Sequence, residues 1–378
     1  MKPGRSIWRT SWRVGLCLLL LGWVFHSIFL NEGRLAWERG GHAWSELSRA
    51  DQWHMAWFHG PTELIRTLRL LEPWHGVLSV VFMGLTIVLG MLRWRMVLRV
   101  QGIHLPLSRA WEISLVSHFF NSFLLGSTGG DLMKAYYAAR ETHHLKTEAV
   151  VTVVVDRLLG LLSMLIFAAL MMLPNLKLLE AHRRLAALAG LILAMLAGGG
   201  LVTGLSFWGG LSRRWPSARN WLRRMPKAET IERSLEACRR FGHEPMFLLK
   251  AFGLSMVLNA ICVFQLGSLA SGLKLNVDPV ALFLVVPVVI CISALPITPS
   301  GLGLRENLYV WMLAVPEIHV PATQALSLSL LAYAGSLLWS VVGGLVYVTF
   351  KEKHHLAEVV APPGVEAEET AEPVRPPG

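Results

Sequence analysis

Residues 121–131 read Asn-Ser-Phe-Leu-Leu-Gly-Ser-Thr-Gly-Gly-Asp and interrupt a short apolar segment, residues 110–125. This segment is shorter than the ~20 residues that a helix needs to cross a bilayer. Gly126, Gly129 and Gly130 allow the positive φ angles and the close backbone approach at which a helix can break. The stretch therefore predicts a broken helix that enters the membrane and turns back.

The charges on both sides of this break indicate the face from which the helix enters. Basic residues are frequent in residues 93–109 before it and in residues 134–146 after it. Cytoplasmic loops of membrane proteins carry an excess of Lys and Arg. Both flanks are therefore expected in the cytoplasm, so that the broken helix enters and leaves by the cytoplasmic face.

A second short apolar segment, residues 280–295, is also followed by a break. Residues 296–306 read Pro-Ile-Thr-Pro-Ser-Gly-Leu-Gly-Leu-Arg-Glu, and residues 307–315 follow them. The flanks of this segment carry little charge. The charge-based topology is consistent if this segment enters the membrane from the outer face, because Ala270 is then external and Lys351 is cytoplasmic.

Around these two elements lie long apolar blocks. The chain is 53% hydrophobic and only 16% charged, whereas soluble domains are about 25% charged. The blocks are residues 14–30, 76–92, 149–173, 185–208, 246–270 and 323–350. We therefore expect an all-α polytopic membrane protein with about six spanning helices and two re-entrant helices; eight full spans with glycine-rich turns are the alternative.

The order of these elements predicts an inverted-topology repeat within a single membrane domain, residues 1–350. A helix, a broken element and a helix follow one another in residues 76–173, and again with opposite orientation in residues 246–350. Interrupted apolar segments at corresponding places in two halves are typical of transporters, whose substrate sites lie near the bilayer midplane.

The remaining segments are assigned by their charge. Basic residues precede the first block and no cleavage pattern follows it, which indicates an uncleaved helix and a cytoplasmic N-terminus. Residues 31–75 are rich in tryptophan and are expected as amphipathic helices at the outer headgroup level. Residues 209–245 form a basic cytoplasmic loop, and residues 351–378 a disordered cytoplasmic tail. We expect the protein in the inner or plasma membrane.

Several classes of function are disfavoured by the composition. The net charge is +10, but the basic residues follow the ends of apolar blocks, so a nucleic-acid partner is not expected. The four cysteines are far apart, and His42, His54 and His59 match no ligand spacing, so neither a metal nor a cofactor is predicted. No catalytic motif is present, which makes an enzyme the less favoured interpretation.

The candidate substrate site consists of ionisable and turn-forming residues at the two breaks and inside residues 149–173. They are Asn121, Gly129, Gly130, Asp131, Lys134, Asp156, Arg157, Pro296, Gly301, Gly303, Arg305 and Glu306. A charge at the bilayer centre costs at least ~2.5 kcal/mol and is a functional hypothesis by default. The alternative is that these charges pair with one another and lock the bundle.

The chemistry of these residues suits a phosphate. A guanidinium such as that of Arg157 binds phosphate in a bidentate manner. Helices that begin just after a break present free amides, which also bind phosphate. Tyr136, Tyr137, Tyr309 and Trp311 are expected at interface depth or between helices.

Three blocks of the sequence resemble the signature blocks of the lysylphosphatidylglycerol synthase transmembrane-region family. They are residues 121–131, the Asp156-Arg157 pair, and Leu295-Pro296 with residues 301–306, and the resemblance covers residues 14–350 in order. It implies a standalone flippase-like domain without the aminoacyltransferase domain of some members. The family is implicated in moving aminoacylated or other polar lipids between leaflets.

The resemblance implies membrane lipids as partners, either an anionic phospholipid or a lipid-linked headgroup. In the leading hypothesis Arg157, Arg305 and Lys134 engage the phosphate, while Asp131 and Glu306 engage a cationic or hydroxylated headgroup. A membrane-embedded transferase, with Asp131 or Glu306 as general base, is the second hypothesis. A membrane scaffold acting through the basic loop is the third, and self-association into a homo-oligomer is compatible with all three.

Overall fold

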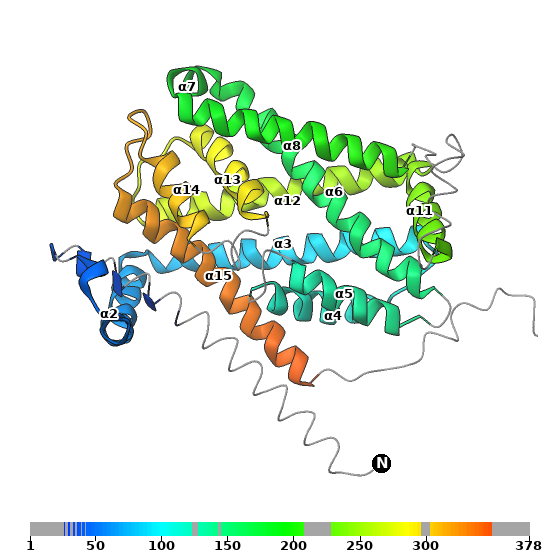
Figure 1. Cartoon of the computed structure of the whole chain (residues 1–378), viewed down its shortest axis with the longest axis horizontal. Helices are drawn as coiled ribbons and strands as arrows, with labels where there is room; N and C mark the ends of the chain where they lie inside the picture. The colour runs from blue at the N-terminus through cyan, green and yellow to red at the C-terminus, as the bar shows by residue number, and fades with distance from the viewer. Residues whose placement is uncertain are drawn as a thin grey trace, which may run out of the picture.

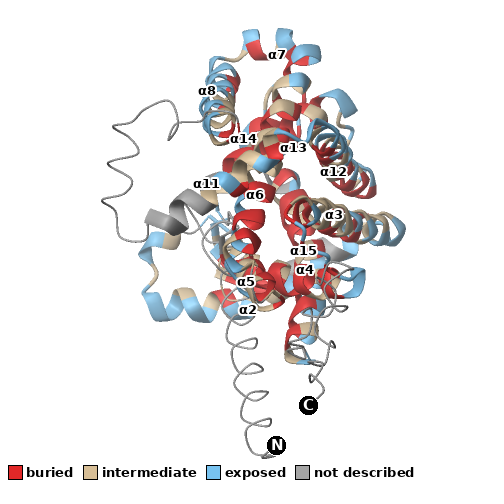
Figure 2. Cartoon of the chain, turned by 90° about the vertical axis from the view of Figure 1, so that its right-hand side faces the viewer, coloured by how far each residue is buried: buried red, intermediate tan, exposed pale blue. Residues whose placement is uncertain are grey.

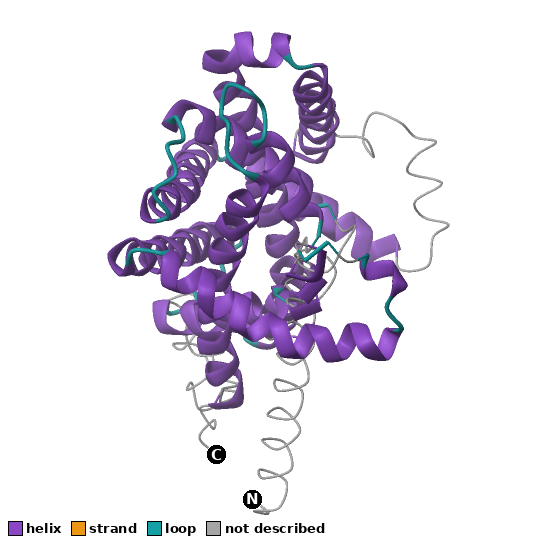
Figure 3. Ribbon diagram, turned by 90° about the vertical axis from the view of Figure 1, so that its left-hand side faces the viewer, coloured by secondary structure: helices purple, strands orange, loops and turns teal. Residues whose placement is uncertain are grey.

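The computed structural model consists of α-helices, and no strand occurs in the part of the chain that it describes (Figure 3). The described residues are 26, 29–30, 33–34, 36–38, 40–41, 43–122, 128–142, 145–207, 228–295 and 303–349. The expected first helix lies almost entirely outside these residues, and the tail 351–378 and much of the basic loop lie outside them too. The all-α class is confirmed.

Five helices in the described part are long and apolar enough to cross a membrane. They are α3 (Pro73–Val100), α6 (Lys146–Met172), α8 (Arg183–Phe207), α12 (Pro245–Gly272) and α15 (Ala322–Thr349). Helix α6 continues through η2 (Leu173–Asn175) into α7 (Leu176–Ala181). Twenty-five residues of helix, the length of α8, span ~37 Å, more than the hydrocarbon core. The chain is a multi-pass membrane protein.

One of these helices is longer than the sequence pattern indicated. The apolar block 76–92 was expected to end before Arg93, but α3 continues to Val100. Val97 and Leu98 are fully buried, and they extend the packed face of the helix past the basic residues. Arg93 therefore lies inside a spanning helix and not in the loop that follows it.

The first predicted break forms a helical hairpin. Helices α4 (Leu107–Asn121) and α5 (Thr128–Arg140) fold back and pack on each other. A Cβ on Gly130 would lie 2.2 Å from the carbonyl oxygen of Ser117, so only glycine permits this approach. At the base of the hairpin, the guanidinium of Arg109 lies 2.5 Å from the carboxylate of Glu141. The hairpin is therefore closed at both ends.

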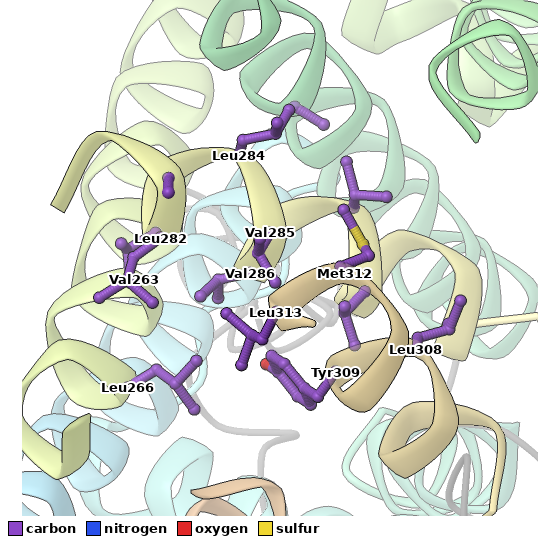
Figure 4. Packing of buried hydrophobic residues seen from close by; sticks show 14 of the residues in the cluster. Val263, Leu266, Leu282, Leu284, Val285, Val286, Leu308, Tyr309, Met312 and Leu313 are labelled. Carbon is purple, nitrogen blue, oxygen red and sulfur yellow. The ribbon is translucent and has the colours of Figure 1, made fainter. Parts of the chain in front are cut away.

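The second predicted break forms another hairpin. Helix α13 (Pro279–Ser293) begins at a proline, and the preceding Asp278 accepts a hydrogen bond of 3.0 Å from the amide of Val280. Helix α14 (Leu304–Leu313) starts after Gly303, whose φ of 81° suits glycine. Apolar side chains of α13, α14 and α12 interlock, as Figure 4 shows for Val285, Leu313 and neighbouring residues.

The two hairpins start from opposite ends of a central helix pair. Helices α3 and α12 lie side by side and antiparallel, because the amide of Glu72 donates to the carbonyl of Gly272 at 3.1 Å, while Arg93 donates to Ser255 at 2.9 Å further along (Figure 1). The α4–α5 hairpin follows the C-terminal end of α3, and the α13–α14 hairpin follows that of α12.

The packing of the two hairpins is reciprocal. Helix α4 packs on α15 and α5 packs on α6, whereas α13 packs on α6 and α14 packs on α15. Each hairpin therefore contacts one long helix from its own half of the chain and one from the other half. These contacts bring the two broken ends to the middle of the bundle.

The remaining helices lie around this centre. Helix α2 (Arg49–Leu70) forms within the segment that was expected to be amphipathic, after a short turn η1 (Trp44–Glu46). Helix α11 (Ala228–Gly242) packs Phe241 between α8 and α12. Figure 2 shows exposed residues along much of α8 and buried residues towards the centre. Exposed Leu193 and Leu201 on α8 are apolar, which suits a lipid-facing surface.

Candidate functional site

Two adjoining cavities lie between the broken ends of the hairpins. We call the first, of about 420 Å³, the charged cavity. It is lined by Arg93, His118, Asn121, Ser122, Asp131, Asp156, Arg157, Gly160, Leu161, Met164, Ile290, Ser293, Ala294, Arg305, Tyr333 and Ser336. These residues come from both hairpins and from α3, α6 and α15, so the cavity exists only because the two halves pack together.

We call the second cavity, of about 510 Å³, the α3–α12 cavity. Its lining is Met83, Thr86, Ile87, Gly90, Met91, Ser114, Ser117, His118, Asn121, Asp131, Lys134, Met164, Leu258, Asn259, Cys262, Gln265, Leu266, Val286, Ile290, Arg305, Tyr309, Ala332, Tyr333 and Ser336. The two cavities share eight of these residues, among them Asn121, Asp131 and Arg305. A ligand that occupies one cavity can therefore extend into the other.

Asp156 is the buried centre of the charge cluster. One carboxylate oxygen accepts a hydrogen bond of 2.8 Å from Arg93, and the other lies 3.2 Å from the ammonium of Lys134. Gly160, one turn further along α6, leaves the space in which the guanidinium of Arg93 lies. Removing one member of a buried ion pair leaves an uncompensated charge, which is strongly destabilising. This triad joins α3, α5 and α6.

Arg157 and Asp131 form a second, more accessible pair. The guanidinium of Arg157 on α6 bonds to the carboxylate of Asp131 at the start of α5. Their side chains are 22% and 30% exposed, against 10% for Asp156, so these two groups can meet a ligand more readily. The pair connects the first hairpin to α6 a second time.

Arg305 carries the charge of the second hairpin into the charged cavity. Its guanidinium lies 2.5 Å from the carboxylate of Glu306 and 4.5 Å above the ring of Tyr333. The hydroxyl of Tyr333 donates to the carbonyl of Ser122 at 3.3 Å. Tyr333 on α15 therefore contacts both hairpins, at the end of α4 and the start of α14.

The two helix starts after the breaks do not present all the free amides that the sequence suggested. The amide of Gly130 donates to the side-chain oxygen of Asn121 at 2.8 Å, and the amide of Gly303 donates to Glu306 at 2.6 Å. Polar side chains are good caps for such amides. These two amides are therefore already hydrogen-bonded to side chains of the protein and are not available to a phosphate.

The structure brings together most of the predicted site residues. Asn121, Asp131, Asp156, Arg157 and Arg305 line the charged cavity, and Lys134 lines the α3–α12 cavity. The other described members lie outside the lining of both cavities: Gly129, Gly130, Gly303 and Glu306. Pro296 and Gly301 lie outside the described residues.

Several polar lining residues were not predicted from the sequence, among them Arg93, His118, Tyr333 and Ser336. Arg93 was interpreted as a topological charge, although the apolar pattern that continues through Leu98 is a signal that the helix does not end there. His118 belongs to a polar face of α4 that repeats at helical spacing with Ser114 and Asn121. Tyr333 and Ser336 are three residues apart on α15, and the ring nitrogen Nε2 of His118 lies 3.2 Å from the carbonyl oxygen of Ser336.

The charged groups at the site carry an excess of positive charge. The cations are Arg93, Lys134, Arg157 and Arg305, and the carboxylates are Asp131, Asp156 and Glu306. Four positive charges against three negative ones leave a formal excess of +1. No group of three or more potential metal ligands occurs in the described ranges. The arrangement is suited to hold an anion.

Comparison with known proteins places the chain in a family. Residues 52–344 match the family described as the lysylphosphatidylglycerol synthase TM region. The chain is also similar to a UPF0104 membrane protein of Methanothermobacter thermautotrophicus, with 24% identity over 316 residues that cover 78% of this chain and 89% of the relative. Because the match includes both hairpins, four of the long helices and most of α15, the chain belongs to the lysylphosphatidylglycerol synthase transmembrane-region family.

Proposed function

We propose that this protein is a flippase-like translocator that moves a phosphate-bearing polar lipid between the two leaflets. The observation that carries the proposal is the charged cavity, in which a positive excess lies between the broken ends of two hairpins. Charges this deep among spanning helices mark substrate pathways in membrane proteins. The family is named for a membrane region associated with an aminoacylated phospholipid, which is consistent with a lipid substrate.

Arg157 is the residue proposed to bind the phosphate directly. It lines the charged cavity and is partly exposed, and its planar fork matches two phosphate oxygens. A phosphate at this place competes with Asp131 for the guanidinium. Arg305 approaches the same cavity from the second hairpin, held by Glu306 and Tyr333.

Arg93 and Lys134 have a different proposed role. Both are bound to Asp156, and their side chains are only 12% and 11% exposed. They contribute positive potential to the cavity and position α3 and α5 against α6. Glu306 is likewise a positioning residue for Arg305, and not a contact for the headgroup.

The reciprocal packing of the hairpins supports an alternating-access mechanism. Helices α3 to α6 and helices α12 to α15 are the two halves of the proposed inverted repeat, and the two hairpins follow opposite ends of the antiparallel α3–α12 pair, as entry from opposite membrane faces requires. Rocking one half against the other around the fixed charges would open the cavity to each leaflet in turn. In this proposal both termini are cytoplasmic and the protein lies in the cell membrane.

The test is leaflet exchange in reconstituted vesicles. The full-length protein is reconstituted with tail-labelled fluorescent phosphatidylglycerol, and a quencher outside the vesicles reports how fast the inner label becomes accessible. Exchange should exceed that of protein-free vesicles. Arg157→Gln should slow it roughly ten- to hundredfold, since a hydrogen bond to a charged group is lost.

Matched variants separate a phosphate contact from a general effect. Arg157→Lys keeps the charge but loses the bidentate fork, so it should fall between the parent and Arg157→Gln. Arg183→Gln removes an exposed guanidinium that is not among the cavity residues, and should leave the rate unchanged. Unchanged exchange with folded protein across a panel of headgroups contradicts translocation. Covalent change of the extracted lipid, seen by mass spectrometry, would favour the transferase.

A further inference from the structure

The α3–α12 cavity contains two buried polar groups that have no hydrogen-bond partner in the described part of the chain. They are the side-chain amide nitrogen of Asn259 on α12 and the hydroxyl of Ser114 on α4. Both residues are 7% exposed, and both line the cavity. A buried donor is costly to leave unpaired, so these two groups indicate the chemistry of a ligand.

The carboxylates of the site are already engaged by cations. Of the described residues, Asp131 and Asp156 are the acids that line the two cavities. Asp131 is paired with Arg157, and Asp156 is paired with both Arg93 and Lys134. A cationic group on the lipid would therefore have to displace an arginine or a lysine before it met a carboxylate.

The uncharged polar residues in the lining of the α3–α12 cavity suit a different kind of group. Besides Asn259 and Ser114, it includes Gln265 and the buried ring of Tyr309. Amides and hydroxyls both donate and accept, which matches the hydroxyls of a polyol. A ring face can pack against the C–H groups of the same polyol. The volume of about 510 Å³ lies within the usual range for small-ligand sites.

We infer that the transported lipid is a phosphodiester whose group beyond the phosphate is neutral and hydroxylated, such as a glycerol or a sugar. The phosphate lies in the charged cavity, and the polyol lies in the α3–α12 cavity, where Asn259 and Ser114 bind its hydroxyls. The residues that the two cavities share allow one headgroup to reach both. The inference rests on the proposed function and names the substrate class for the same site.

Equilibrium binding to the full-length protein in detergent tests this without requiring transport. Three tail-labelled lipids with identical acyl chains are compared: phosphatidylglycerol, which has a neutral diol; phosphatidylmethanol, which has no hydroxyl; and lysylphosphatidylglycerol, which carries a cation. Phosphatidylglycerol should bind about five- to tenfold more tightly than the other two, the contribution expected from neutral hydrogen bonds.

Variants assign the preference to the α3–α12 cavity. Asn259→Leu should reduce the affinity for phosphatidylglycerol about five- to tenfold and leave that for phosphatidylmethanol unchanged. Ser114→Ala should act in the same direction with a smaller effect. Asn276→Leu is the matched control, because Asn276 is exposed and is not a lining residue. Arg157→Gln should weaken the binding of phosphatidylglycerol and of phosphatidylmethanol by the same factor, because both carry one negative charge on the phosphate.

Several outcomes would overturn the inference. They are tighter binding of lysylphosphatidylglycerol, equal binding of all three lipids, and an Asn259→Leu variant that weakens the binding of phosphatidylglycerol and phosphatidylmethanol by the same factor. The comparison on the unaltered protein is decisive even where a variant fails to fold. A binding preference without leaflet exchange would contradict the proposed translocation alone, whereas exchange without a preference would contradict this inference alone.

Discussion

The two hairpins share one architecture but are held by different forces. The α4–α5 hairpin is attached to α6 by the ion pairs of Asp131 and Lys134, and its base is closed by Arg109 and Glu141. The α13–α14 hairpin is packed almost wholly through apolar side chains, and Arg305 is its charged contribution to the cavities. The first hairpin thus combines apolar packing, including the fully buried Ile113 and Phe119, with most of the charge, whereas the second relies almost wholly on apolar packing.

Because of this difference, substitutions in the two hairpins should affect stability and lipid exchange differently. Loss of an ion pair in the first hairpin should affect stability and lipid exchange together, because the same charges serve both. Loss of apolar volume in the second should affect stability more than exchange.

Asp156→Ala should have the largest effect. It leaves Arg93 and Lys134 buried without their carboxylate, which is expected to cost about 3–5 kcal/mol of folding free energy. The measurement is denaturant unfolding of the purified protein, with lipid exchange followed in parallel. Glu180→Gln removes an exposed acid and serves as the control. An Asp156→Ala protein as stable as the parent would refute the ionic attachment of the first hairpin.

Leu313→Ala tests the apolar packing of the second hairpin. Leu313 is fully buried between α13 and α14, so truncation should cost about 2–4 kcal/mol through lost contacts and a cavity. Exposed Leu193→Ala is the control and should be nearly neutral. At a temperature where the variant remains folded, its exchange rate should stay close to that of the parent. A large loss of exchange there would break the proposed division between the hairpins.

Glycine variants compare the two breaks directly. Gly130→Ala places a methyl group against the carbonyl of Ser117 and should cost about 1–3 kcal/mol through overpacking. Gly303→Ala has open space around it but a φ of 81°, so it should cost about 1–2 kcal/mol through backbone strain. Thermal unfolding of both variants shows which substitution is more destabilising, and we expect it to be Gly130→Ala. A larger loss for Gly303→Ala would show that backbone strain costs more than steric overlap at these breaks.

The smallest effect is expected at the exposed pair of His182 and Glu317, which lie 2.6 Å apart. The hydrogen bond from His182 lowers the pKa of the Glu317 carboxyl below its usual value. Stabilisation by this carboxylate is therefore present above its ordinary pKa and is lost as the pH falls through the lowered one. Glu317→Gln should be slightly less stable at neutral pH and equal to the parent in acid. Unfolding temperatures across this pH range provide the check.

The positions of the helices could be predicted from the sequence because a helix that crosses the bilayer must be long enough and apolar enough to span its hydrocarbon core. The block 246–270 corresponds closely to α12, and both breaks occur where glycine and proline interrupt short apolar segments. The end of α3 was predicted wrongly, because a basic residue after an apolar run looks the same whether it ends a helix or is neutralised inside the bundle. Only Asp156, 63 residues away, distinguishes the two cases for Arg93.

The membership of the site was more predictable than its pairing. Asp131, Asp156, Arg157 and Arg305 stand out because ionisable residues are rare in apolar surroundings. Which acid meets which base depends on the tertiary packing of α3, α5 and α6, and this has no local sequence signal. The capping of Gly303 by Glu306 is different, since a glycine followed three residues later by a glutamate is a local pattern that indicates a helix start.

Tyr333 connects the two broken ends through contacts with both hairpins. Its hydroxyl donates to the carbonyl of Ser122, at the end of α4, and its ring covers Arg305 of the other hairpin. A shift of either end beyond hydrogen-bonding range releases one contact while the other persists. In the proposed alternating-access mechanism, Tyr333 would therefore link the displacements of the two broken ends, and removing it is expected to let both ends open at once, so that a gated path becomes a leak.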